Sequence, residues 1–332
     1  GIRDQPRSRG LGDVYKRQVL YNDQPLEKVL KYISSIGYEA VELAAWKAST
    51  HLNIDKILSG GATEYKRLIE SFNLTISAIS NHLEGQLILG PHDSSTDEWY
   101  KGTPEEKVKY GVERMKKTIE AAAQLDVHVV NSFVGCPNWS AWYIFPPAYE
   151  KIWESYYDLF KERWLPILDY AKDHEVKLAF ETHPQELNYN LETAKKLLEV
   201  ANEHPALGFN YDPSHFVWQQ MDPVIFIYEL GKRIFHVHAK DVEVIPHQAA
   251  RTGVLVTGAW NRVARAVRFR TVGWGQVPWR RVITALLEVG YDYVMSVEHE
   301  DPTFSRDSGV EQAIAYLKPL LKVKPPEVKP WW

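Results

Sequence analysis

Residues 176–215 read VKLAFETHPQELNYNLETAKKLLEVANEHPALGFNYDPSH and contain one complete strand–helix–strand unit. The apolar run at 176–181 predicts a short buried strand, 191–203 predicts a helix, and 207–210 predicts the next strand. Short apolar strands that alternate with helices are typical of a parallel sheet covered by helices. This unit therefore places the chain in the α/β class.

The same alternation continues on both sides of this unit. Further strands are expected at 40–44, 74–80, 127–133, 234–238 and 293–297, and further helices at 25–36, 54–72, 104–125, 149–174, 223–230, 277–289 and 310–321. A first strand, of which only 19–21 remains, brings the expectation to eight strand–helix units, which implies closure into a (β/α)8 TIM barrel. Long segments follow the third, fourth and seventh strands, and we expect them to cover a site: 81–102, 134–148 and 241–276.

The N-terminal segment does not fit this pattern. Residues 1–18 read GIRDQPRSRGLGDVYKRQ, and the final DVYKRQ looks like the translation of a sequencing-library adaptor. We therefore expect 1–18 to be non-native and the first strand to be truncated, with 14–20 as the segment that could take its place. The alternative is a genuine disordered N-terminal arm. The rest is expected to form a single catalytic domain at 19–322, followed by a C-terminal tail at 323–332.

Composition and charge narrow the class of protein. Of the 332 residues, 45% are hydrophobic and 25% are charged, as in ordinary globular proteins. A net charge of −4 gives no general attraction to nucleic acid or to an anionic membrane. The single cysteine, Cys136, excludes a disulfide framework and fits a reducing cytoplasm, which is the compartment we expect. No apolar run is long enough to span a membrane.

Acidic residues and histidines stand at the ends of four successive predicted strands. They are Glu181, His183, Asp212, His215, His236, His238, Asp241, Glu298 and Glu300. The strands of a barrel converge, so these groups point toward one place. Three carboxylates and one neutral imidazole in a confined space are costly unless a cation balances their charge, and oxygen and nitrogen ligands suit Mn²⁺, Mg²⁺, Co²⁺ or Zn²⁺. We expect one divalent cation, with Mn²⁺ as the first choice; salt bridges among buried polar groups are the alternative.

This arrangement resembles the motifs of the xylose isomerase-like TIM barrels, a group often named sugar phosphate isomerase/epimerase. The resemblance covers residues 19 to about 321 and is carried by Glu181, Asp212-x-x-His215, His238-x-x-Asp241 and Glu298. It implies that the metal ligands are Glu181, Asp212, His238 and Glu298. It further implies that His215 and Asp241 orient these ligands or face the substrate.

By the same resemblance, Glu181 and Glu298 would both hold the metal and move protons at a carbon next to a carbonyl, through a metal-stabilised enediolate. Glu300 competes with Glu298, since strand alternation sends both side chains to the same face, and only the family pattern favours Glu298. The implied activity is that of a carbohydrate isomerase or epimerase.

Two other activities remain open for a barrel of this kind. Elimination would give a lyase or dehydratase acting on an inosose, or on a 3-oxo-glycoside as the large subunit of a C-glycoside deglycosidase. The abasic-site endonuclease of DNA repair is a remote alternative, which the net charge of −4 disfavours.

Further residues are candidates for contacts around the substrate. His82, just after the third predicted strand, is a candidate acid–base residue, with a structural role as its alternative. The candidate substrate-binding residues are Glu42, Trp46, His183, His215, Lys240, Asp241 and Arg270. The expected partner is a small-molecule carbohydrate, with no nucleic acid and no membrane. The chain is expected to act either as a homodimer or with a small second subunit.

Overall fold

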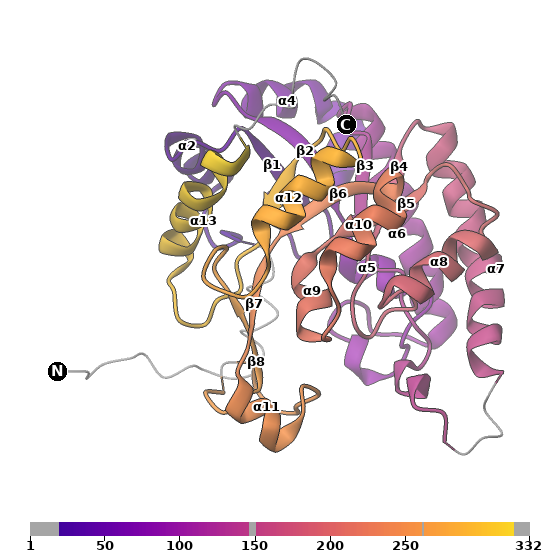
Figure 1. The fold of residues 1–332 in the computed structure, drawn as a ribbon. Helices are drawn as coiled ribbons and strands as arrows, with labels where there is room; N and C mark the ends of the chain where they lie inside the picture. The colour runs from indigo at the N-terminus through magenta and orange to yellow at the C-terminus, as the bar shows by residue number, and fades with distance from the viewer. Residues whose placement is uncertain (1–19, 146–150, 261, 322–332) are drawn as a thin grey trace, which may run out of the picture.

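The computed structural model describes residues 20–145, 151–260 and 262–321. Its main element is a parallel sheet of seven strands, in the order β1–β2–β3–β4–β5–β6–β9, which curves into a barrel surrounded by helices (Figure 1). The fold is a TIM barrel of the α/β class, as predicted. The strands are β1 (Ala40–Ala44), β2 (Thr75–Ser80), β3 (Val129–Ser132), β4 (Lys177–Glu181), β5 (Leu207–Tyr211), β6 (Ile234–Ala239) and β9 (Met295–Val297).

Helices connect successive strands and cover the outside of the sheet (Figure 1). The longer helices are α2 (Leu26–Ser35), α4 (Ala62–Glu70), α6 (Pro104–Gln124), α7 (Ile152–Asp173), α8 (Leu191–Val200), α10 (Pro223–Leu230), α12 (Trp279–Glu288) and α13 (Arg306–Leu321). The short ones are α3 (Ile54–Lys56), α5 (His82–Gln86), α9 (Pro213–Trp218) and α11 (Pro246–Thr252), besides a π-helical turn at Ile57–Gly61 and 3₁₀ turns at Ser94–Thr96, Trp139–Trp142 and Gly231–Arg233.

Local sequence signals fix where two of these connections become helical. α6 begins with a capping box, in which Thr103 Oγ1 accepts from Glu106 N at 3.3 Å and Glu106 Oε2 accepts from Thr103 N at 2.8 Å. α8 begins in a similar way, because the side chain of Asn190 accepts from Thr193 N at 2.8 Å. The loops after β2 and β4 therefore end at defined residues.

The register of the strands brings their carboxyl ends to a common rim. Every residue of β3 and β5 is buried, as expected for strands covered on both faces. Glu181 pairs with Asn210 across β4 and β5, and Ala239 pairs with Val297 across β6 and β9. Side chains that end these strands therefore lie at a similar height in the barrel.

Residues 20 and 21, where the end of the first strand was expected, do not form a strand. Residues 20–23 form a turn, in which Gln24 N donates to Tyr21 O at 2.9 Å and Tyr21 has a φ of 65°. A strand needs negative φ, so Tyr21 cannot continue one. The segment 14–19 lies outside the described residues. Within the described ranges, the outer edges of β1 and β9 have no paired strand, and both strands line one pocket.

The long segment 241–276 is more regular than the sequence suggests. It contains β7 (Asp241–Val244) and β8 (Val267–Arg270), which form an antiparallel pair, with α11 between them. Figure 1 shows this hairpin and α11 extending away from the barrel. Among the described residues, no helix has the length and apolar character needed to cross a membrane.

Replacing Trp164 with alanine should lower the free energy of unfolding by about 3–5 kcal/mol. The side chain is fully buried on α7, its Nε1 donates to the Val134 carbonyl at 2.9 Å, and its ring contacts Phe180 with centroids 4.7 Å apart. Truncation would leave a cavity and an unpaired buried carbonyl. Urea denaturation followed by circular dichroism measures the change. Trp142→Ala, at a side chain that is 44% exposed, is the control, and an equal effect of the two variants would contradict the prediction.

Candidate metal centre

Four side chains from neighbouring strands meet at one rim of the barrel. Glu181 is the last residue of β4, Asp212 follows β5, His238 lies in β6 and Glu298 follows β9. One ligand atom of each lies within 4.8 Å of the others. Glu181, Asp212 and His238 are buried, and Glu298 is half-buried. The structure thus brings together the four residues that the sequence analysis assigns to a metal.

Asp212 shows how the local fold aims a ligand. Its Oδ1 accepts from Ser214 N at 2.8 Å and so caps α9, which fixes the orientation of the carboxylate. Its Oδ2 lies 3.2 Å from His215 Nε2 and 3.1 Å from Lys240 Nζ. Burial raises the pKa of Asp212, but Lys240 and His215 outweigh burial and hold this pKa below its ordinary value. Asp212 therefore carries a negative charge in the cluster.

Glu181 lies at the centre of a set of imidazoles. Its Oε1 lies 3.1 Å from His215 Nε2, and its Oε2 lies 3.0 Å from His82 Nε2 and 3.4 Å from His238 Nδ1. Burial raises the pKa of Glu181, but hydrogen bonds from His215, His238 and His82 hold it well below its ordinary value. The predicted acid–base residue His82 and the predicted ligand-orienting residue His215 therefore both contact a predicted metal ligand.

Lys240 is placed among carboxylates at the same rim. Its buried ammonium lies 3.1 Å from Asp212 Oδ2, 3.0 Å from Glu298 Oε1 and 3.4 Å from Glu300 Oε2. Burial lowers the pKa of Lys240, but these carboxylates hold it well above its ordinary value. The lysine therefore supplies a positive charge to the cluster, besides lining the pocket as expected for a substrate contact. Glu300 contacts Lys240 and lies outside the four-residue group, whereas Glu298 belongs to it.

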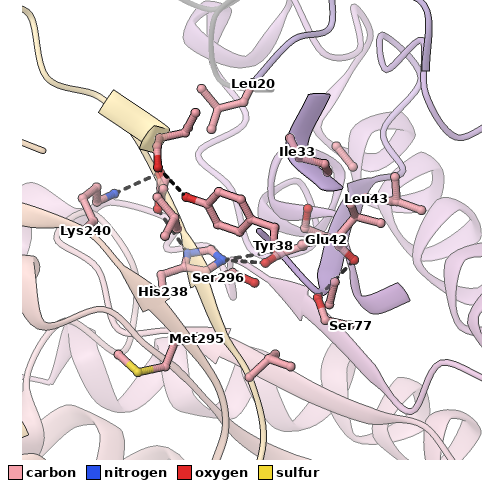
Figure 2. Close-up of a pocket in the computed structure, with 18 of the residues that line it drawn as sticks. Leu20, Ile33, Tyr38, Glu42, Leu43, Ser77, His238, Lys240, Met295 and Ser296 are labelled. Atoms are coloured by element: carbon pink, nitrogen blue, oxygen red, sulfur yellow. Dashed lines mark hydrogen bonds and ion pairs between the residues drawn. The ribbon is translucent and has the colours of Figure 1, made fainter. Parts of the chain in front are cut away.

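A pocket of about 600 Å³ opens on this group. Near the rim it is lined by Trp46 and His183, two of the predicted substrate contacts, and by His82. Burial lowers the pKa of His183 to about 3, so its imidazole is neutral. The pocket also extends between β1 and β9, where apolar and polar side chains both line it: Figure 2 shows Ile33, Leu43 and Met295 as well as Glu42, Ser77 and Ser296.

Asp241 and Arg270 do not line this pocket. The Asp241 carboxylate accepts from three backbone N–H groups and from Trp279 Nε1, at 2.8 to 3.0 Å, and so ties β7 to the segment before α12. The Arg270 guanidinium pairs with Glu243 Oε2 at 2.7 Å and with Asp301 Oδ2 at 3.1 Å. Both predicted substrate residues are thus engaged by the protein around the β7–β8 hairpin.

A second group of side chains lies in the barrel interior, and the sequence analysis assigned its members only in part. Glu42 of β1, His236 and His238 have ligand atoms within 4.8 Å of one another. Glu42 was expected to bind substrate, and His236 had no assigned role. Strand alternation is the signal that finds His236, because residues two apart on β6 point to the same side.

The fold and the site define a TIM barrel with a candidate metal centre. The model of the family described as "Xylose isomerase-like TIM barrel" matches residues 30–320, and the chain belongs to this family. It is 29% identical over 326 residues to the uncharacterized protein YfiH of Bacillus subtilis (strain 168), covering 89% of this chain and 94% of that one. It is 27% identical over 150 residues to the inosose dehydratase of Clostridium tetani, a match that covers 45% of this chain and 48% of that one.

Solved structures share the fold at low sequence identity. A D-tagatose 3-epimerase-like protein superposes with a TM-score of 0.59 and 22% identity, covering 86% of this chain and 89% of that one. The IOLI protein with a bound zinc atom superposes with a TM-score of 0.61 and 18% identity, covering 92% and 95%. The known neighbours thus include enzymes and a metal-binding barrel.

Glu186 is a buried carboxyl group that the sequence analysis did not single out. It follows β4 by five residues, and its Oε2 accepts from Gly135 N at 2.6 Å. Burial raises its pKa to about 8, because no positively charged side chain is among the groups that shift this pKa. A loop glutamate has no periodicity that would reveal its burial from the sequence.

Glu186 should make the protein less stable as the pH rises from about 4 to about 8. The unfolded chain releases this proton near the ordinary glutamate pKa of about 4.3. The folded protein keeps it up to about 8, so in this window the unfolded state binds fewer protons. The unfolding free energy of Glu186→Gln, measured by urea denaturation at several pH values, should therefore fall less across the window than that of the parent. Parallel curves would show that Glu186 is ionised in the folded protein.

Proposed function

We propose that the protein is a divalent-metal-dependent enzyme that moves a proton at a carbon next to a carbonyl of a carbohydrate, as an isomerase or epimerase. The observation that carries this proposal is the group of Glu181, Asp212, His238 and Glu298, whose ligand atoms lie within 4.8 Å of one another. The neighbouring epimerase-like fold and the inosose dehydratase relative support it.

The donor atoms of this group fit a divalent cation. Three carboxylates and one imidazole suit Mn²⁺, Mg²⁺, Co²⁺ or Zn²⁺, and Mn²⁺ is the ion we propose first. Asp212 Oδ2 lies 3.1 Å from Lys240 Nζ, and Glu298 Oε2 lies 3.2 Å from His238 Nδ1. These two buried oxygens already face positively charged partners, which is the kind of neighbour that a cation would be.

In this proposal Glu181 and Glu298 move the proton. A bound cation would polarise the carbonyl and hydroxyl oxygens of the substrate and make the adjacent C–H bond more acidic. Glu181 Oε2 and Glu298 Oε2 lie 3.4 Å and 3.2 Å from His238 Nδ1, so the two carboxylates approach one point from different strands. Removal by one and return by the other on the opposite face inverts the carbon, whereas return to the neighbouring carbon isomerises the sugar.

Side chains at the pocket rim are placed to bind the sugar. Trp46 offers an apolar ring face. Lys240 contacts Asp212, Glu298 and Glu300, and it would turn one of its three N–H groups from a carboxylate to a substrate oxygen. His82 lies 3.0 Å from Glu181 Oε2 and lines the pocket, so it can exchange a proton with substrate or with Glu181.

A second candidate function is elimination, which would make the protein a dehydratase or lyase. The similarity to the inosose dehydratase of Clostridium tetani favours this reading. The chemistry begins with the same proton removal, and His82 is the residue placed to protonate a leaving hydroxyl.

Elemental analysis of the purified protein tests the metal centre directly. We expect about one equivalent of Mn, Co, Zn or Mg in the parent and almost none in Asp212→Ala, because one charged ligand is lost. Glu300→Gln is the matched control and should keep its metal, since Glu300 lies outside the four-residue group. Absence of metal from the parent after incubation with these ions would refute the proposal.

Deuterium exchange from solvent tests the proposed reaction. The metal-loaded parent should incorporate deuterium next to the carbonyl when ketoses, inososes and 3-oxo-glycosides are screened. Glu181→Gln should lose about 10²–10⁴-fold of this rate, because the proton acceptor is removed. Metal content is measured first, so that loss of metal is not mistaken for loss of the base. Exchange at the parent rate in metal-loaded Glu181→Gln would exclude Glu181 as the base. Identification of the reaction products distinguishes epimerisation from elimination.

A further inference from the structure

Glu42 and His238 face each other inside the barrel, on the side of His238 away from the metal group. His238 Nδ1 points to Glu181 and Glu298, whereas His238 Nε2 lies 3.0 Å from Glu42 Oε2 and 3.2 Å from Glu42 Oε1. Figure 2 shows this contact between strands that lie far apart in the sequence. The ring of His238 therefore bridges the metal group and Glu42.

The Glu42 carboxylate is occupied by donors from the protein. His236 Nε2 lies 2.9 Å from its Oε2, and Asn131 Nδ2 donates to its Oε1 at 2.9 Å. Together with His238, three N–H groups converge on two oxygens. Asparagine Nδ2 is always a donor, and a carboxylate can only accept, so each imidazole must present its Nε2–H to Glu42. The protein thus takes three of the roughly four acceptor sites of the Glu42 carboxylate, which leaves about one for a substrate hydroxyl, the role that the sequence analysis gave it.

We propose that Glu42 is the positioning residue for His238, holding its proton on Nε2 so that Nδ1 presents a lone pair to the cation. This inference rests on the metal centre proposed above. A neutral imidazole has one N–H and one lone pair, and the partner of its far nitrogen decides which nitrogen can bind metal. A carboxylate in that place also fixes the plane of the ring and increases the basicity of the ligating nitrogen.

Glutamine at position 42 would reverse this arrangement. It has nearly the same shape as glutamate, but it offers one acceptor oxygen and one NH₂ donor. Three protein donors cannot all be accepted by that single oxygen. An amide NH₂ that faces His238 would favour the proton on Nδ1, and an Nδ1–H cannot bind a cation.

The first test leaves Glu42 unchanged. With ¹⁵N-labelled histidine and Zn²⁺ as the probe, two-bond N–H correlation spectra identify which nitrogen of the ligating imidazole carries the proton. We expect the proton on Nε2 and the metal on Nδ1 of the histidine signal that disappears in His238→Gln. The reverse assignment would overturn the proposal without any variant at position 42.

The second test compares Glu42→Gln with Glu186→Gln, which changes another buried glutamate whose hydrogen bond goes to Gly135 N and which lies outside the four-residue metal group. We expect Glu42→Gln to bind Co²⁺ about 10–100-fold more weakly than the parent and to lose the hyperfine-shifted imidazole N–H signal. Glu186→Gln should have the Co²⁺ affinity and the imidazole N–H signal of the parent. Circular dichroism and unfolding curves establish that each variant is folded.

Three results would overturn the positioning role of Glu42. One is unchanged Co²⁺ affinity in Glu42→Gln together with an unchanged N–H signal. Another is a Glu42→Gln variant with unchanged Co²⁺ affinity and a higher KM for the sugar substrate, which would make Glu42 a substrate contact. The third is a second equivalent of Co²⁺ in the parent that Glu42→Gln lacks, which would make Glu42, His236 and His238 a metal site. A parent that binds no metal would instead refute the metal centre itself.

Discussion

Repulsion among the carboxylates of Glu181, Asp212 and Glu298 is the constraint on which the rim of this barrel depends. Their ligand atoms, with that of His238, lie within 4.8 Å of one another, and such charges cannot be gathered in a protein interior without compensation. Imidazoles and the ammonium of Lys240 provide that compensation in the structure described here. The same arrangement explains why Lys240 is buried, which is unusual for a lysine.

The neighbourhood of the candidate ligands could be predicted from sequence because they stand at the ends of parallel strands. In this topology a residue at a carboxyl end has a known direction and known neighbours, so the acidic residues and histidines that end four strands were expected at one place. The resemblance was needed to select Glu181, Asp212, His238 and Glu298 among them, including Glu298 over Glu300, since both glutamates lie on the same face. In the structure, the two differ by their partners: Glu298 contacts both His238 and Lys240, whereas the ion pair found for Glu300 among the described residues is with Lys240.

The segments between strands could not be predicted in the same way, because their structure depends on contacts between distant residues. The β7–β8 pair is joined by Glu243, which binds Arg268 and Arg270 at 2.8 and 2.7 Å. Both strands alternate charged and apolar residues, DVEV in β7 and VRFR in β8, but each alternation covers only four residues of a segment that was interpreted as a long loop. The contacts of Asp241 could not be predicted either, because its four N–H donors come largely from residues 273–279, which are distant in the sequence. Strand alternation puts His236 on the same side of β6 as His238, but its contact with Glu42 depends on how β1 and β6 face each other in the folded barrel.

The edge position of β9 has a consequence for how the barrel holds together. All three residues of β9 are half-buried, whereas β3 and β5 are buried throughout, and β9 pairs only with β6 among the described strands. Strands with less burial and fewer partners open more readily than the core. Glu298 follows this strand, while Glu181, Asp212 and His238 belong to the interior of the sheet. A cation bound by all four residues would link the end of β9 to β4, β5 and β6. Its binding energy would then oppose detachment of the edge strand, in addition to holding the site together.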